Sequence, residues 1–228
     1  PFPSTKGVAV IFDIFRCSTT IHCLKHLAVG PLYVAPSLLE AERNPQTSGW
    51  RLFSELPEQI PCLKRFDNSP LQALESSCDT GIPALVATTS GTPAMFAARG
   101  FERVYVGSLV NFSALVKSLC AYDGPITLIP AARPEWDHVE DEIVCQAVAT
   151  ALEGFTDIPD FVRQCAENAK ERITTSHRPE HLARKLPTGR EDVKLSLEID
   201  RFPHQLLSLA FENGPLAEVI QENPCATG

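Results

Sequence analysis

The sequence predicts an α/β fold of three layers, in which a mainly parallel sheet is covered by helices on both faces. Short apolar runs alternate with helical patterns along most of the chain, which is the order of elements in such folds. The first run, 8–12, is continuously apolar and contains β-branched residues, as is typical of a strand buried on both faces. The chain has 228 residues, 44% hydrophobic and 21% charged, which fits one globular domain.

The first strand is followed by a helix and a second strand. We expect the helix over 20–28, because its apolar residues fall on one stripe, and the strand over 32–35. Ser37 and Glu40 have the spacing of a capping box, which predicts the start of the next helix. The stretch 43–68 is rich in proline and predicts an irregular loop that contributes to a site.

The rest of the chain continues this alternation. Apolar patterns predict helices over 70–77, 93–99, 111–121, 139–153 and 159–172, and strands over 84–87, 103–106 and 126–129. After a polar stretch, an apolar helix is expected near 205–211. Residues 20–38 and 92–109 are similar, so the single domain either contains two similar halves, 1–80 and 81–228, or repeats a common α/β pattern.

Charge and cysteine content narrow the range of functions. A net charge of −8 and a pI near 5.3 argue against a nucleic-acid-binding protein, which needs a basic face. Apolar runs stay far below the roughly 20 residues of a membrane-spanning helix, so we expect no membrane association. The eight cysteines are widely spread without a CxxC pair, which indicates reduced thiols in a cytoplasmic protein, not disulfides or a zinc site.

The turn after the first strand carries groups suited to binding a phosphate. Asp13 ends the strand and offers carboxylate oxygen to a divalent cation, and Arg16 offers two parallel N–H groups to a phosphate. Ser18, Thr19 and Thr20 lie where the next helix is expected to begin, which favours an anion. The structural alternative is that a hydroxyl caps this helix and Asp13 pairs with Arg16.

Further polar turns follow later strands. One comprises Thr89, Ser90, Gly91 and Thr92, and another contains Ser108 and Asn111. Their hydroxyls and amides would either bind an anion or simply cap the next helix.

Glu140 and Asp141 begin a later helix. Acidic residues in a first turn often interact only with the helix dipole, but beside Asp13 they would complete a carboxylate site for Mg²⁺. The carboxyl ends of parallel strands share one edge of a sheet. We therefore expect Asp13, Arg16, the Gly91 turn and at least one of Glu140 and Asp141 to line one pocket.

Other titratable side chains have simpler interpretations. Solvated helix faces are expected for His22, His26, His177 and His181. Cys17 is either a buried thiol or a nucleophile beside Arg16. Arg51 and Arg133 are candidates for binding a second acidic group of a substrate.

Taken together, the turns resemble the 2-phosphosulfolactate phosphatase family. Residues 10–20, Val-Ile-Phe-Asp-Ile-Phe-Arg-Cys-Ser-Thr-Thr, are similar to its opening signature of a strand, Asp-x-x-Arg and a run of small and hydroxyl residues. Further similar segments, in the family's order, are Ser54-Glu55, 66–70, 88–92, 107–111, Glu140-Asp141 and 190–193.

The resemblance implies a Mg²⁺-dependent phosphatase of sulfonate and coenzyme M biosynthesis that hydrolyses a small phosphorylated acid. It implies catalytic roles for Asp13, Arg16, Glu140 and Asp141, with Mg²⁺ bound by Asp13, Glu140 and Asp141. It implies substrate binding by Ser18, Thr19, Thr20, Glu55, Asn68, Ser69, Thr89, Ser90, Gly91, Thr92 and Asn111. We also expect a homo-oligomer, a dimer. Replacing Arg16 with alanine is expected to impair catalysis with little change in thermal stability.

Three departures from the family pattern surround the expected pocket. Ser90 replaces the usual asparagine, Ala132 stands where glycine is expected, and the loop before Asn68 is two residues shorter. A phosphatase for a different small phosphoester, or a ligand-binding relative without catalysis, therefore remains an alternative.

Overall fold

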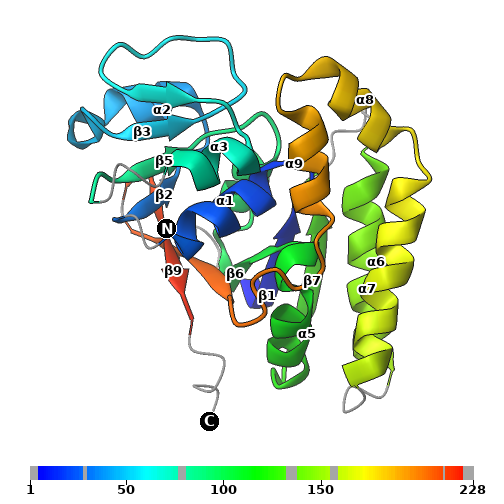
Figure 1. Ribbon diagram of the computed structural model, residues 1–228. Coiled ribbons are helices and arrows are strands. Elements are labelled where there is room, and N and C mark those ends of the chain that lie inside the picture. The colour runs from blue at the N-terminus through cyan, green and yellow to red at the C-terminus, as the bar shows by residue number, and fades with distance from the viewer. Residues whose placement is uncertain are drawn as a thin grey trace.

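The computed structural model describes residues 5–27, 30–76, 81–131, 138–154, 159–212 and 214–222. In this part of the chain nine strands form one sheet, in the order β4-β3-β5-β2-β9-β8-β6-β1-β7 (Figure 1). The strands are β1 (Thr5–Phe12), β2 (Leu32–Val34), β3 (Arg51–Phe53), β4 (Lys64–Phe66), β5 (Ala84–Val86), β6 (Phe101–Gly107), β7 (Ile126–Pro130), β8 (Leu207–Phe211) and β9 (Ala217–Gln221).

Helices fill the connections between these strands. They are α1 (Cys17–His26), α2 (Leu38–Arg43), α3 (Pro70–Glu75), α4 (Gly91–Ala97), α5 (Phe112–Cys120), α6 (Val139–Glu153), α7 (Pro159–Thr174), α8 (Arg178–Lys185) and α9 (Gly189–Ser196), with short 3₁₀ turns η1 (Pro45–Thr47) and η3 (Leu109–Asn111). Within the described ranges, none of them is both long and apolar enough to span a membrane.

The predicted α/β class with a mainly parallel sheet is confirmed. Five of the strand pairings are parallel and three are antiparallel. Alternate residues of β1 face opposite sides: Val8 and Val10 pack with α5, α6 and α7, whereas Ala9 and Ile11 pack with α1 and α4. Both faces of this strand are therefore buried, which explains its unbroken apolar run.

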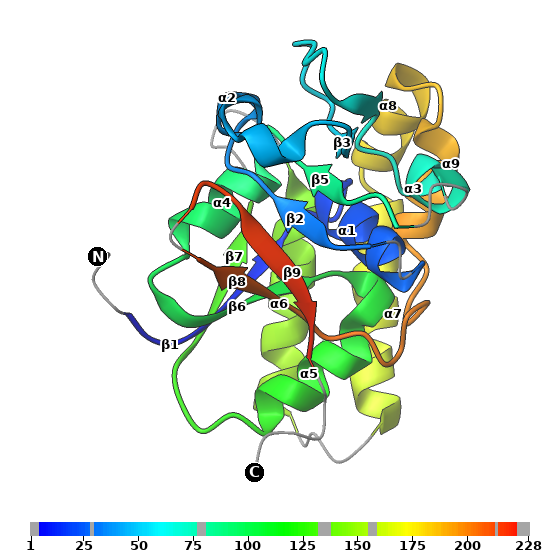
Figure 2. The same cartoon turned by 90° about the vertical axis from the view of Figure 1, so that its left-hand side faces the viewer.

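The predicted helix at 205–211 is wrong, because Leu207–Phe211 forms strand β8. A short apolar run fits either a helix or a strand, and here the antiparallel partners on both sides select the strand. Figure 2 shows β8 and β9 between β2 and β6. The irregular interpretation of 43–68 also omitted the three-residue strands β3 and β4.

The two outer parts of the sheet run in opposite senses. β9 is antiparallel to β2 and β8, and β8 is antiparallel to β6. The strands β4, β3, β5 and β2 therefore oppose β6, β1 and β7, so the expectation that all strand ends share one edge is wrong. Strands typically twist by about 20–25° per pairing, and over the five pairings from β5 to β1 this turns their direction by roughly a right angle or more. In the coiled sheet, side chains after β3, β4 and β5 still line one cavity with those after β1.

Candidate active site

A cavity of about 510 Å³ lies between the loops after these strands and helix α8. The strand loops contribute Asp13 after β1, Glu55 after β3, Asn68 after β4, and Thr89 and Ser90 after β5. The cavity is further lined by Phe15, Arg16, His138, His177, Arg178, His181, Leu182, Lys185 and Leu186. One wall is thus rich in carboxylate and amide oxygen, and the other is a helix with basic side chains.

Asp13 is buried at the point where α1 and α4 begin. Its carboxylate accepts hydrogen bonds from the amide of Cys17, at 3.2 Å, and from the amide of Gly91. Burial, together with the nearby Glu55 carboxylate, raises the pKa of Asp13 to about 7. The two amide hydrogen bonds oppose this shift without cancelling it, so the site disfavours negative charge on Asp13 when no cation is bound.

Gly91 is required by the close approach of α4 to α1. A Cβ atom at this position would lie 2.6 Å from Oδ2 of Asp13 and 2.8 Å from Cβ of Cys17. Only glycine leaves the Asp13 carboxylate in its place beside the α4 amide. The predicted Gly91 turn and Asp13 therefore do meet, as expected.

Glu55 is held by the loop after β5. Its Oε1 accepts hydrogen bonds from the amide of Thr89 at 2.7 Å and from its hydroxyl at 2.9 Å. The other oxygen, Oε2, is buried without a hydrogen-bond partner in the part of the chain that the structure describes, and so is Oδ1 of Asn68. Both side chains line the cavity, and each has one buried oxygen that no donor among the described residues satisfies.

The expectation that at least one of Glu140 and Asp141 lines the pocket is wrong, because both are buried and neither lines the cavity. Asp141 accepts a hydrogen bond of 2.8 Å from the amide of Ile14, which fixes the loop after β1. Burial and the Asp13 carboxylate raise the pKa of Asp141 well above its usual range. Glu140 forms a bidentate ion pair with Arg178, with nitrogen–oxygen distances of 3.1–3.2 Å.

Arg16 lines the cavity but is already bound by two carboxylates. Its Nη1 donates to Asp67 at 2.8 Å and to Asp192 at 2.9 Å, and its Nη2 donates to Asp67 at 3.2 Å. Asp192 also accepts hydrogen bonds from the hydroxyls of Ser69 and Thr188. The predicted structural alternative, a pair between Asp13 and Arg16, is not what the structure shows.

Several residues expected to bind substrate use their side chains within the fold. Ser18 accepts from the Asp13 amide at 3.0 Å, and Asn111 accepts from the Ser108 amide at 3.0 Å. Ser18, Thr19, Thr20, Ser69, Thr92 and Asn111 are buried and do not line the cavity. The first three lie inside α1, which begins at Cys17 and not at residue 20. Glu55, Asn68, Thr89 and Ser90 do line it.

Two further expectations need correction. Arg51 is fully buried and donates to the carbonyls of Ser76 and Ile82, so it does not reach the cavity. His22 is also buried, with Nδ1 2.6 Å from Oε1 of Gln205, and burial lowers its pKa to about 4. Ala132 and Arg133 lie outside the described residues.

Cys17 is a buried thiol beside Asp13. Burial and the Asp13 and Glu55 carboxylates raise its pKa well above the usual range. A thiol in this state is a poor nucleophile. Of the two interpretations from the sequence, the geometry fits the buried thiol.

The oxygen donors of the cavity fit a hard divalent cation. Among the described residues no three His, Cys, Asp or Glu side chains converge as a ready-made metal site. Mg²⁺ is commonly held by one or two carboxylates, with water and substrate phosphate completing its shell. Asp13 would supply such a ligand, and a bound cation would offset the burial and the carboxylate repulsion that raise its pKa.

The sequence analysis missed the contribution of α8. His177, Arg178, His181 and Lys185 all line the cavity, although no local motif marks them. The spacing of His177, His181 and Lys185, four residues apart, was the available signal, since such residues share one helix face. This spacing indicates a functional role only once the fold places that helix face opposite Asp13.

An α/β fold whose cavity joins a carboxylate wall to a basic helix defines an enzyme class that acts on small anionic substrates. The family model described as 2-phosphosulpholactate phosphatase matches residues 2–204. The chain therefore belongs to the 2-phosphosulfolactate phosphatase family, which confirms the resemblance found in its turns.

Relatives of this chain carry the same description. A "Probable 2-phosphosulfolactate phosphatase" from Thermoplasma volcanium is 30% identical over 179 residues, covering 75% of this chain and 81% of the relative. One from Symbiobacterium thermophilum is 32% identical over 152 residues, covering 64% of each. A third, from Clostridium beijerinckii, is 27% identical over 145 residues, covering 60% of this chain and 58% of the relative.

Proposed function

We propose that this protein hydrolyses 2-phosphosulfolactate to sulfolactate and inorganic phosphate. Family membership supports the reaction class, and the names of the relatives support the substrate. The observation that carries the proposal is that Asp13, Glu55 and Arg16 all line one cavity. Phosphoryl transfer needs this combination of positioning and charge neutralisation more than it needs a covalent intermediate.

Arg16 would bind a phosphoryl oxygen without leaving its carboxylate partners. A guanidinium has five N–H donors, and three hydrogen bonds to Asp67 and Asp192 leave two of them for a ligand. Those ion pairs fix the side chain in place, so its orientation is set before substrate arrives.

Glu55 is the best placed group to act on the attacking water. The Thr89 amide and hydroxyl anchor Oε1, which leaves Oε2 to accept a hydrogen bond in the cavity. A carboxylate held in this way orients a water molecule and takes up its proton as the water attacks phosphorus.

Asp13, with Asp141 beside it, would hold Mg²⁺. When bound, the ion neutralises phosphoryl oxygens and the developing charge on the leaving group. Glu140 is less suited to this role, because Arg178 already occupies both of its oxygens.

Phosphate release from a graded set of substrates tests the proposal. We expect 2-phosphosulfolactate to exceed both 2-phospholactate, which lacks the sulfonate, and isopropyl phosphate, which lacks sulfonate and carboxylate. Glu55→Gln keeps the size of the side chain and should lower kcat by about 10²–10⁴-fold. The matched control is Glu58→Gln, an exposed residue of the same loop.

The outcomes separate the alternatives. Preference for another phosphoester would assign a different substrate, for which the Ser90 side chain in the cavity wall is the first place to look. No phosphate release from any of the three would contradict catalysis altogether.

We also propose a cytoplasmic homodimer, from the cysteine content and the family resemblance. Five cysteines within the described residues are free thiols, in keeping with a reducing compartment: Cys17, Cys23, Cys62, Cys145 and Cys165. Light scattering on the purified protein measures its mass against the 25.0 kDa of one chain.

A further inference from the structure

We propose that Lys185 and His181 of α8 bind a second anionic group of the substrate, a sulfonate or a carboxylate, while the phosphoryl group lies at Asp13 and Arg16. This inference rests on the proposed function, since it concerns the remainder of the same substrate. It gives α8 a role in specificity that no motif in the sequence indicated.

Helix geometry places the two side chains on one face. His177, His181 and Lys185 follow each other at intervals of four residues, so they form one row along α8 and its N-cap. All three line the cavity, across from the loops that carry Asp13 and Glu55. An anion at Lys185 would therefore lie at the opposite wall from the carboxylates that would repel it.

The charges of the other long basic side chains in the cavity are already compensated. Arg16 pairs with Asp67 and Asp192, and Arg178 pairs with Glu140. Among the lysines and arginines that line the cavity within the described residues, Lys185 alone has no ion pair or hydrogen bond from its side chain. Lys185 is thus the lysine or arginine of the cavity whose charge no carboxylate of the described residues offsets.

The Arg178–Glu140 pair fixes the position of this face. Both partners are largely shielded from water, with 14% and 1% of their side chains exposed, and the pair joins α8 to the start of α6. Leu182 and Leu186, one helical turn apart, line the same cavity beside Lys185. An anion bound there would be partly screened from solvent by these apolar side chains, which strengthens its attraction to the ammonium group.

The positions of the acidic groups in the proposed substrate fit the arrangement of Arg16 and Lys185. 2-Phosphosulfolactate carries its phosphoryl group on the central carbon and one acidic group at each end. With phosphate fixed at Arg16, an ion pair to Lys185 selects which end of the molecule turns toward α8. The contact would thereby distinguish this substrate from phosphoesters without a second acid.

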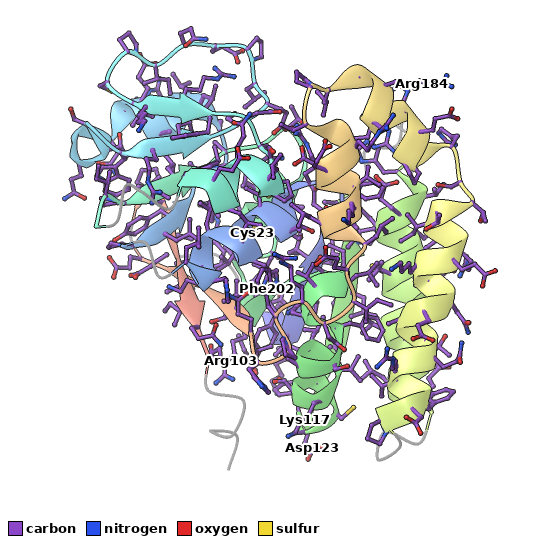
Figure 3. The ribbon with its side chains drawn as sticks, viewed as in Figure 1. Cys23, Arg103, Lys117, Asp123, Arg184 and Phe202 are labelled. Carbon is purple, nitrogen blue, oxygen red and sulfur yellow. The ribbon has the colours of Figure 1, made fainter. Side chains whose placement is uncertain are left out.

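The test compares Lys185→Gln with Arg184→Gln. Arg184 is the adjacent residue, its side chain is 78% exposed, and it projects outward from α8, away from the rest of the protein (Figure 3). We expect Lys185→Gln to raise KM for 2-phosphosulfolactate about tenfold or more, the range of a lost charged hydrogen bond, with little change in kcat. KM for isopropyl phosphate should stay the same, and Arg184→Gln should change neither.

The three substrates identify the group that is bound. A Lys185 effect with 2-phosphosulfolactate but not with 2-phospholactate assigns the sulfonate, and an equal effect with both assigns the carboxylate. An equal rise in KM for isopropyl phosphate would overturn the inference, because that ester has no second anion.

Calorimetry of sulfolactate binding, in the presence of Mg²⁺, separates this inference from the proposed function. If no phosphate is released but Lys185→Gln weakens sulfolactate binding about tenfold, the proposed reaction is wrong and the binding role stands. If phosphate is released normally and Lys185→Gln changes neither KM nor sulfolactate affinity, the reaction stands and the role of Lys185 is wrong. Absence of sulfolactate binding to the unmodified protein also overturns the inference.

Discussion

Replacement of Arg16 by alanine should destabilise the protein as well as impair catalysis. The Arg16 side chain is 4% exposed and Asp192 is fully buried, so removing the guanidinium leaves an uncompensated carboxylate in the interior. Breaking a buried ion pair in this way typically costs about 3–5 kcal/mol. Asp192 keeps hydrogen bonds from Ser69, Leu71 and Thr188, which places the expected loss near the lower value, about 3 kcal/mol.

A double-mutant cycle in urea denaturation measures this coupling. In the Arg16→Ala background, Asp192→Asn should recover about 1–2 kcal/mol of the free energy of unfolding, since it removes the unpaired charge. Arg163→Ala is the control, because Arg163 is 72% exposed and the loss of its surface pair with Glu167 should change the free energy of unfolding little. A loss below about 1 kcal/mol for Arg16→Ala, or no recovery by the second change, would refute this reasoning.

Three further predictions follow from the surroundings of Asp13. In the absence of divalent cations, the pKa of Asp13 is about 7 in the folded protein and 3.8 in the unfolded chain, so folding takes up a proton between these pH values. The free energy of unfolding therefore falls as the pH rises from about 4 to 7. The free energy of unfolding of Asp13→Asn, measured in urea, should therefore rise relative to that of the unmodified protein by about 2–3 kcal/mol between pH 5 and pH 8, and an equal difference at both pH values would disprove it. Gly91→Ala should abolish activity, because its Cβ would lie 2.6 Å from the Asp13 carboxylate; full phosphate release would contradict this close packing. Iodoacetamide should leave activity unchanged at pH 8, because Cys17 is buried with a raised pKa; inactivation that Cys17→Ala prevents would instead identify a nucleophile.

From the sequence alone, we expected Arg16→Ala to impair catalysis without a loss of stability. The buried ion pair with Asp192 reverses the second part of that expectation. The turn at 13–16 and its basic and acidic side chains are visible in the sequence, but Asp192 is 176 residues away from Arg16. No local pattern reports an ion pair across that separation. The same applies to Arg178 and Glu140, whose contact depends on how α8 packs against α6.

Strands were predictable where burial on both faces leaves a continuous apolar run, as in β1. The strands β3 and β4 were not predictable, because three residues are too few to show a pattern. Strand β8 was not predictable, because its neighbouring strands decide its conformation. The meeting of Asp13 and Gly91 was predictable from their turns, whereas Glu55 was named only through the family resemblance. The basic wall of the cavity was missed, because residues of an ordinary amphipathic helix acquire their role only from the opposite side of the fold.

Titration of Mg²⁺ into chelator-treated protein tests the central claim most directly, namely that the carboxylates at Asp13 hold the cation needed for phosphoester hydrolysis. We predict that binding measured by calorimetry and phosphate release from 2-phosphosulfolactate appear over the same range of Mg²⁺ concentration, and that Asp13→Asn loses both. Full activity in excess chelator, or binding of Mg²⁺ by Asp13→Asn as tight as by the unmodified protein, would contradict it.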